Sequence, residues 1–211
     1  MINLSDKIIL QIDAALKTLW PSQPRLTPRA TPGKDSKPAK LNHQQKKHIA
    51  GLMRVNHTGE VCAQALYQGQ ALTAKLEDIR EKMLQSADEE IDHLAWCESR
   101  LTDLDAHTSY VNSLWYVLSF TIGATAGLIG DKWSLGFVVE TERQVTHHLE
   151  SHLKQIPSSD EKTIQILQQM IIDESNHAAS ALAAGGVELP IFIKTLMQFM
   201  SKFMTKTSYY F

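Results

Sequence analysis

Two Glu-x-x-His pairs are the residues of this sequence best suited to chemistry. Glu90 and His93 form one pair, and Glu174 and His177 form the other. Side chains three positions apart on an α-helix lie on one face, so each pair can direct a carboxylate oxygen and an imidazole nitrogen at one point. In four-helix bundles that bind two iron or manganese ions, two helices each supply such a pair and the other two each supply one glutamate. The spacing therefore predicts two metal-binding helices and requires two further glutamates.

The further glutamates occur where the pattern requires them. Hydrophobic residues recur every three or four positions in four segments, which predicts four amphipathic helices: 52–70, 76–104, 135–153 and 164–181. In each segment one glutamate falls among the core-facing positions, in the order Glu60, Glu90, Glu142 and Glu174. Burying an uncompensated charge costs several kcal/mol per ion, so four carboxylates in one core need cations beside them.

Metal ions are the cations that the pattern favours, because the lysines and arginines fall mostly in a linker, at helix ends and on solvent faces. Two divalent ions would neutralise four carboxylates, with His93 and His177 as neutral ligands. A ligand set dominated by oxygen, with one imidazole per ion, suits iron or manganese better than zinc.

Residues around these ligands also have predicted roles. An acidic residue precedes each paired glutamate, Glu89 in one case and Asp173 in the other. Metal-bound histidines usually donate their second N–H to a carboxylate or a carbonyl, so we expect Asp173 to contact His93 and Glu89 to contact His177. Tyr67 lies at a core-facing position of 52–70 and either packs in the core or hydrogen-bonds in the metal pocket.

Length and composition are those of an ordinary globular protein. The 211 residues suffice for one well-buried domain, with 43% hydrophobic and 21% charged residues. The formal net charge of -2 argues against a general nucleic-acid partner. The two cysteines have no metal-binding spacing, which favours a reducing compartment.

The pattern divides the chain into three regions. Residues 1–20 predict an amphipathic helix, residues 21–40 with five prolines predict a mobile basic linker, and residues 41–211 contain the four-helix domain. Within that domain, 106–130 lacks formal charge and predicts a hydrophobic crossover helix rather than a membrane span. Residues 189–211 predict a further helix, basic and aromatic, which either packs on the bundle or lies at a membrane interface. We therefore expect an all-α, ferritin-like four-helix bundle with a crossover helix and an extra C-terminal helix.

Five segments of this chain resemble, in the same order, the motifs of the demethoxyubiquinone hydroxylase family of ubiquinone biosynthesis, the first two segments together forming the first motif. They are residues 54–60, 67–70, 89–94, 138–142 and 173–177. The resemblance runs from about residue 41 to the C-terminus and includes all six predicted ligands. Glu140 lies close to Glu142 in one motif, and the core-facing periodicity favours Glu142 as the ligand.

The resemblance implies a di-iron enzyme. One iron would be bound by Glu60, Glu90 and His93 and the other by Glu142, Glu174 and His177, with Glu90 and Glu174 bridging both. The implied reaction is hydroxylation of the ring of a polyprenylated demethoxy-benzoquinol, demethoxyubiquinol. Molecular oxygen is the co-substrate, and the identity of the reductant stays open.

The implied substrate also predicts a location. A quinol with a long isoprenoid tail resides in the bilayer, so we expect a peripheral protein on the cytoplasmic face of the cell membrane, touching lipid through 106–130 or 189–211. Other proteins of ubiquinone biosynthesis are candidate partners. The alternatives are a ferritin-like iron-oxidising, iron-storage or peroxidase protein, or a non-enzymatic membrane-surface adaptor whose glutamates are structural.

Overall fold

The computed structural model describes residues 4–21, 25, 27 and 29–211, and all of its regular elements are helices. They are α1 (Leu4–Leu19), α2 (His43–Thr73), α3 (Glu77–Asp103), α4 (Asn112–Ile129), α5 (Asp131–Leu153), α6 (Glu161–Ala183) and α7 (Ile191–Tyr210). The predicted all-α class is therefore confirmed. Residues 1–3 of the predicted first helix, and 22–24, 26 and 28 of the predicted linker, lie outside the described residues.

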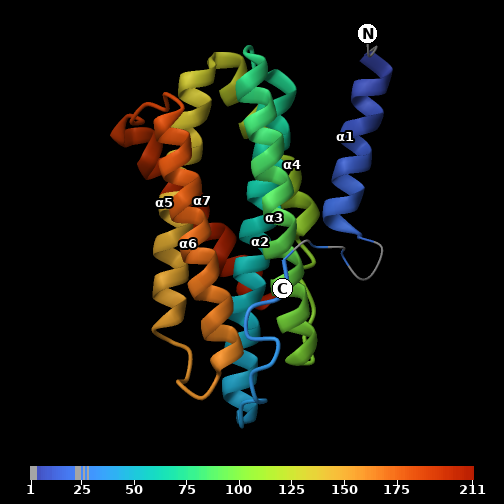
Figure 1. Ribbon diagram of the computed structural model, residues 1–211, viewed down its shortest axis with the longest axis vertical. Helices are drawn as coiled ribbons and strands as arrows, with labels where there is room; N and C mark the ends of the chain where they lie inside the picture. Colours follow the sequence, from blue (N-terminus) through green and yellow to red (C-terminus); the bar gives the residue numbers. More distant parts are fainter. Residues whose placement is uncertain (1–3, 22–24, 26, 28) are drawn as a thin grey trace.

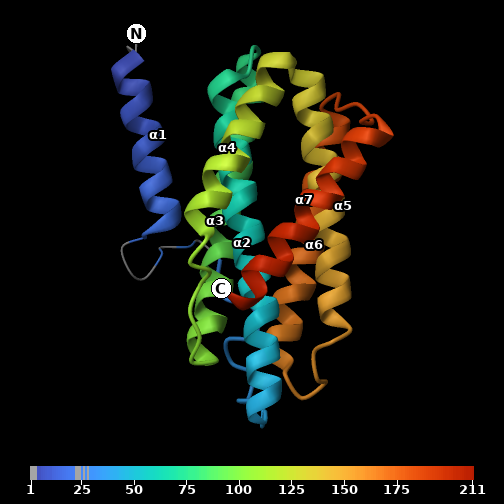
Figure 2. The ribbon, with the colours of Figure 1, turned by 180° about the vertical axis from the view of Figure 1, so that it is seen from behind.

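The four helices that carry the predicted ligands form one bundle, in which α2 pairs with α3 and α5 pairs with α6 (Figure 1). Between the two pairs, α4 returns the chain along α2 to the end of the bundle where α5 begins (Figure 2). The last helix, α7, crosses obliquely and contacts α2 and α5. This arrangement confirms the predicted ferritin-like bundle with its crossover and C-terminal helices. Among the described helices, none has the length and apolar character that crossing a membrane would need.

The helix ends follow from local sequence. Asn42 and Gln45 form a reciprocal capping box at the start of α2. The Asp160 side chain accepts the backbone N–H of Thr163 at the start of α6, and its other oxygen accepts a hydrogen bond of 2.8 Å from Arg100 on α3. These caps satisfy backbone N–H groups that a helix start leaves unpaired.

Close packing of α4 on α2 depends on glycines. A Cβ atom at Gly69 would overlap the carbonyl oxygen of Phe120, and one at Gly123 would overlap the carbonyl oxygen of Leu66. The two backbones therefore touch at positions where one of the two helices has a glycine. This contact holds the crossover helix against the bundle.

Substituting Gly123 with alanine is expected to destabilise the protein by about 1–3 kcal/mol, because the new methyl group forces the two helices apart. Urea unfolding followed by circular dichroism measures this change. Gly59→Ala is the matched control on α2, since a Cβ there meets no atom within 4 Å. It is expected to raise stability by roughly 0.5–1 kcal/mol through helix propensity. Equal unfolding midpoints for Gly123→Ala and the wild type would contradict the close contact.

The core of the bundle has two apolar layers with a polar layer between them. One apolar layer includes Trp96 and Met170, and the other includes Tyr67 and Val139. On each of α2, α3, α5 and α6 the predicted ligands fall between the residues of these two layers. Folding therefore carries all four glutamates to one level of the bundle.

The described part of the linker is docked on the bundle, which differs from the mobile segment that its composition predicts. Arg25 donates hydrogen bonds of 2.9–3.0 Å to both carboxylate oxygens of Glu98 on α3. Gly33 has a positive φ of 68° and lies so close to α6 that a Cβ would come within 2.8 Å of the Cα of Lys162. In Figure 1 the segment runs down the bundle beside α6.

Candidate metal centre

The structure brings all six predicted ligands together in the polar layer. Ligand atoms of one group lie within 4.8 Å of one another, and so do those of a second group. The first group is Glu60, Glu90, His93 and Glu174, and the second is Glu90, Glu142, Glu174 and His177. Because Glu90 and Glu174 belong to both groups, the geometry suits two adjacent cations that share two carboxylates.

Both histidines turn the same nitrogen toward the cluster. Nδ1 of His93 lies 3.0 Å from oxygens of Glu90 and Glu174, and Nδ1 of His177 lies 3.2 Å from oxygens of the same two residues. The outer nitrogens make the expected crossed contacts: Nε2 of His93 lies 2.9 Å from Asp173, and Nε2 of His177 lies 2.7 Å from Glu89. A carboxylate at Nε2 retains the proton there and leaves the Nδ1 lone pair free to bind a metal.

The buried carboxylates of the cluster favour positive charge beside them. Burial, together with the neighbouring carboxylates, raises the pKa of Glu60 and of Glu142 well above the ordinary value. Burial lowers the pKa of His177, but its contacts with Glu174 and Glu90 outweigh this and raise it to about 12. One oxygen each of Glu90, Glu142 and Glu174 is buried and accepts no hydrogen bond. Unfilled carboxylate lone pairs beside two imidazole nitrogens fit a pair of divalent cations.

The structure shows the surroundings of Tyr67 and Glu140, whose roles the sequence left open. The hydroxyl of Tyr67 is buried and donates a hydrogen bond to Glu142, so Tyr67 belongs to the metal pocket as well as to the core. Glu140 instead accepts a hydrogen bond from Gln144 and lies 3.4 Å from Nζ of Lys194. Glu142 is therefore the residue of this motif that faces the cluster.

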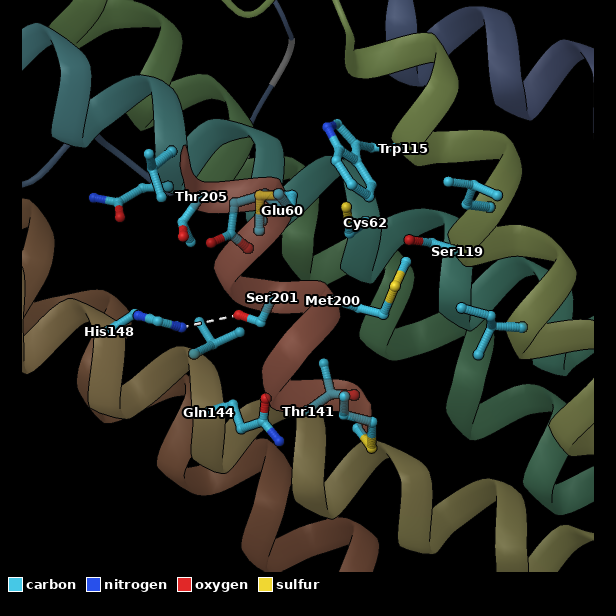
Figure 3. A pocket seen from close by; sticks show the side chains of 18 of the residues that line it. Glu60, Cys62, Trp115, Ser119, Thr141, Gln144, His148, Met200, Ser201 and Thr205 are labelled. Atoms are coloured by element: carbon cyan, nitrogen blue, oxygen red, sulfur yellow. Dashed lines mark hydrogen bonds between the residues drawn. The ribbon is translucent and has the colours of Figure 1, made fainter. Parts of the chain in front are cut away.

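An apolar cavity of about 430 Å³ adjoins the cluster and lies among α2, α4, α5 and α7. Glu60 is one of its lining residues, so the cavity reaches the ligand group directly. Figure 3 shows Trp115 and Met200 facing this space, together with the polar side chain of His148. A second apolar cavity of about 390 Å³ shares Ile122, Phe137 and Ile193 with the first and extends the apolar space toward the start of α7.

A polar cavity of about 460 Å³ lies at the outer nitrogen of His177. Arg29 of the linker and the carboxylates of Glu89, Asp92 and Asp173 are among its lining residues. Sequence reasoning missed Arg29, because nothing in the spacing of the linker distinguishes it from Arg25. It also missed the apolar cavity, whose walls come from four separate helices.

Comparison of the sequence with known proteins matches this chain to a family. The profile described as ubiquinone biosynthesis protein COQ7 matches residues 47–208. A protein of Legionella pneumophila (strain Corby) named 3-demethoxyubiquinol 3-hydroxylase is 57% identical over 205 residues, covering 97% of this chain and 96% of the relative. A protein of Acinetobacter baumannii (strain SDF) with the same name is 56% identical over 205 residues, with the same coverage.

The similarity is wider than the motifs suggested. A match of 205 residues includes most of the first 40 residues, where the motif comparison found no resemblance. The family profile by itself covers all six residues of the ligand cluster. This chain therefore belongs to the ubiquinone biosynthesis protein COQ7 family.

Proposed function

We propose that this protein hydroxylates the ring of 3-demethoxyubiquinol with molecular oxygen, at a two-iron centre held by the six clustered residues. The observation that carries the proposal is the apolar cavity that ends at Glu60, beside the ligand cluster. An apolar space of this kind suits a prenylated ring, and its contact with the cluster places that ring next to the bound metal. The names of the relatives supply the substrate.

The bound irons would activate O2, so that one oxygen atom enters the ring and the other leaves as water, with two electrons from a reductant and two protons. The residues of the chain bind and orient the ring. Burial lowers the pKa of His148, which favours the neutral imidazole, and its Nε2 lies 2.9 Å from Oγ of Ser201, so the two side chains form a polar pair in the cavity wall that a quinol oxygen would meet. Burial raises the pKa of Cys62 to about 11, which keeps this thiol of the cavity wall protonated.

A peripheral position on the cytoplasmic face of the membrane is part of the proposal. Large apolar side chains on α4 and α7 are exposed, among them Leu114, Val117, Leu128, Ile191, Phe192, Phe199 and Phe203. Leu118 and Leu196 are both exposed and part of the cavity wall. The cavity therefore opens within the apolar surface, which suits a substrate that arrives from lipid.

Membrane contact is tested by flotation with vesicles of phosphatidylethanolamine and phosphatidylglycerol. The wild type is expected to float with the vesicles, and Phe199→Asp is expected to reduce the bound fraction severalfold, because a charge on this surface opposes insertion. Leu84→Asp on α3 is the matched control, since Leu84 is also exposed but lies outside α4 and α7. Equal loss of binding in both variants would contradict the assignment of the surface.

The reaction is tested with iron-loaded protein that has been reduced without oxygen and then mixed with ¹⁸O2 and a short-chain demethoxyquinol. We expect a product that has gained one labelled oxygen atom, detected by mass spectrometry. Iron mineralisation without this product would instead favour the iron-storage alternative. A purified protein that binds no iron would favour the adaptor.

A further inference from the structure

The linker residue Arg29 reaches the surroundings of a predicted metal ligand. Its Nε donates a hydrogen bond of 2.5 Å to Asp92, and its Nη1 donates one of 2.7 Å to Oδ2 of Asp173. Its guanidinium group also lies over the ring of Trp96, 4.7 Å from the ring centre. Arg29 thus joins α3 and α6 through one planar cation.

Two of these contacts lead directly to the imidazole of His93. Oδ2 of Asp173, which accepts from Arg29, also lies 2.9 Å from Nε2 of His93. The ring of Trp96 lies 5.2 Å from the imidazole of His93, centre to centre. Asp92 directly precedes His93 in α3. The orientation of this imidazole therefore depends on groups that Arg29 holds in place.

We propose that Arg29 is a positioning residue for the metal centre: it fixes Asp173, and through Asp173 it keeps Nδ1 of His93 directed at the cluster. This inference rests on the two-metal centre of the proposed function. A guanidinium fork can bind two carboxylates at once, and its removal leaves Asp92 and Asp173 without the cation that they share. The docked linker is then a functional part of the centre.

Among the described residues, no arginine holds the carboxylate partner of His177 in the way that Arg29 holds Asp173. The proposal therefore concerns the surroundings of His93 alone. Glu89, the partner of His177, has a side chain that is 44% exposed and otherwise accepts a hydrogen bond from Gln85. Removing Arg29 should therefore disturb the metal site that contains His93 more than the one that contains His177.

Arg25 offers a matched control within the same segment. It also anchors the linker to α3 through a two-pronged ion pair, but its partner Glu98 contacts His57, which lies outside the ligand cluster. Arg25→Gln therefore breaks a similar anchor without touching the surroundings of His93. A purely structural role of the linker would affect both variants alike.

The test is titration of the metal-free protein with Co²⁺, followed by absorbance and by competition with a chelator. We expect two Co²⁺ ions in the wild type, about tenfold weaker binding and an altered absorption spectrum at one site in Arg29→Gln, and a smaller loss in Arg29→Lys, which keeps the charge but not the fork. Arg25→Gln should retain both affinities.

Unchanged affinities and spectra in Arg29→Gln, or in Arg29→Lys if the first variant does not fold, would overturn the inference. So would an equal loss in Arg25→Gln. A wild-type protein that binds no pair of Co²⁺ ions would overturn the two-metal centre itself, and the inference with it, so the two failures are distinguishable.

Discussion

Glu174→Gln is expected to lose bound iron and to reduce ring hydroxylation at least about 100-fold. Glu174 belongs to both ligand groups, so this single substitution would remove an anionic ligand from both of the proposed cations. The amide is nearly the same size but carries no charge and offers a single oxygen. Iron per protein chain and the yield of hydroxylated product measure the two effects.

The metal-free form of the same variant should lose a contact that favours the protonated imidazole of His177. Burial lowers the pKa of His177, but its contacts with Glu174, 3.2 Å from Nδ1, and with Glu90 outweigh this and raise it. The neutral amide no longer favours the cation, so we expect the pKa of His177 to be lower in metal-free Glu174→Gln than in the metal-free wild type, as measured by NMR titration of its imidazole signals. Glu150→Gln is the control, since Glu150 is exposed on α5. Full iron content in Glu174→Gln would refute the role of Glu174 as a shared ligand.

Gly59→Leu is expected to reduce kcat/KM for the demethoxyquinol about 100-fold while the protein keeps its metal and gains stability. Gly59 lies on α2 directly before Glu60, and its position opens into the apolar cavity, where a Cβ meets no atom within 4 Å. A leucine would fill space that the proposed substrate needs. The same substitution improves helix propensity by up to about 1 kcal/mol.

Variants with a small and a large side chain at position 59 distinguish a blocked cavity from a damaged metal centre. Gly59→Ala should keep most of the activity, because a methyl group occupies little of the cavity of about 430 Å³. Iron content should equal that of the wild type in both variants. If Gly59→Leu hydroxylated the substrate at the wild-type rate, the cavity would not be the binding site for the ring.

The ligand cluster could be predicted from the sequence because its information is local and repeated. A glutamate at a core-facing position, with a histidine three residues later, specifies a direction on a helix before any tertiary contact forms. Two helices with such a pair and two with a single glutamate bury their apolar faces together. The position of the carboxylates along the bundle then follows from the apolar residues on either side of them. The same periodicity favoured Glu142 over Glu140, and the structure places Glu142 in the cluster.

The contacts of Arg29 and the apolar cavity were decided only by the tertiary structure. Arg29 meets Asp92 and Asp173, 63 and 144 positions away in the chain, and no helical period relates residues so far apart. The cavity likewise arises where α7 crosses α2 and α5, and its volume depends on how side chains from four helices pack. Periodicity determines which way a residue points along its own helix. Which distant residue it meets depends on how the helices and the linker pack together.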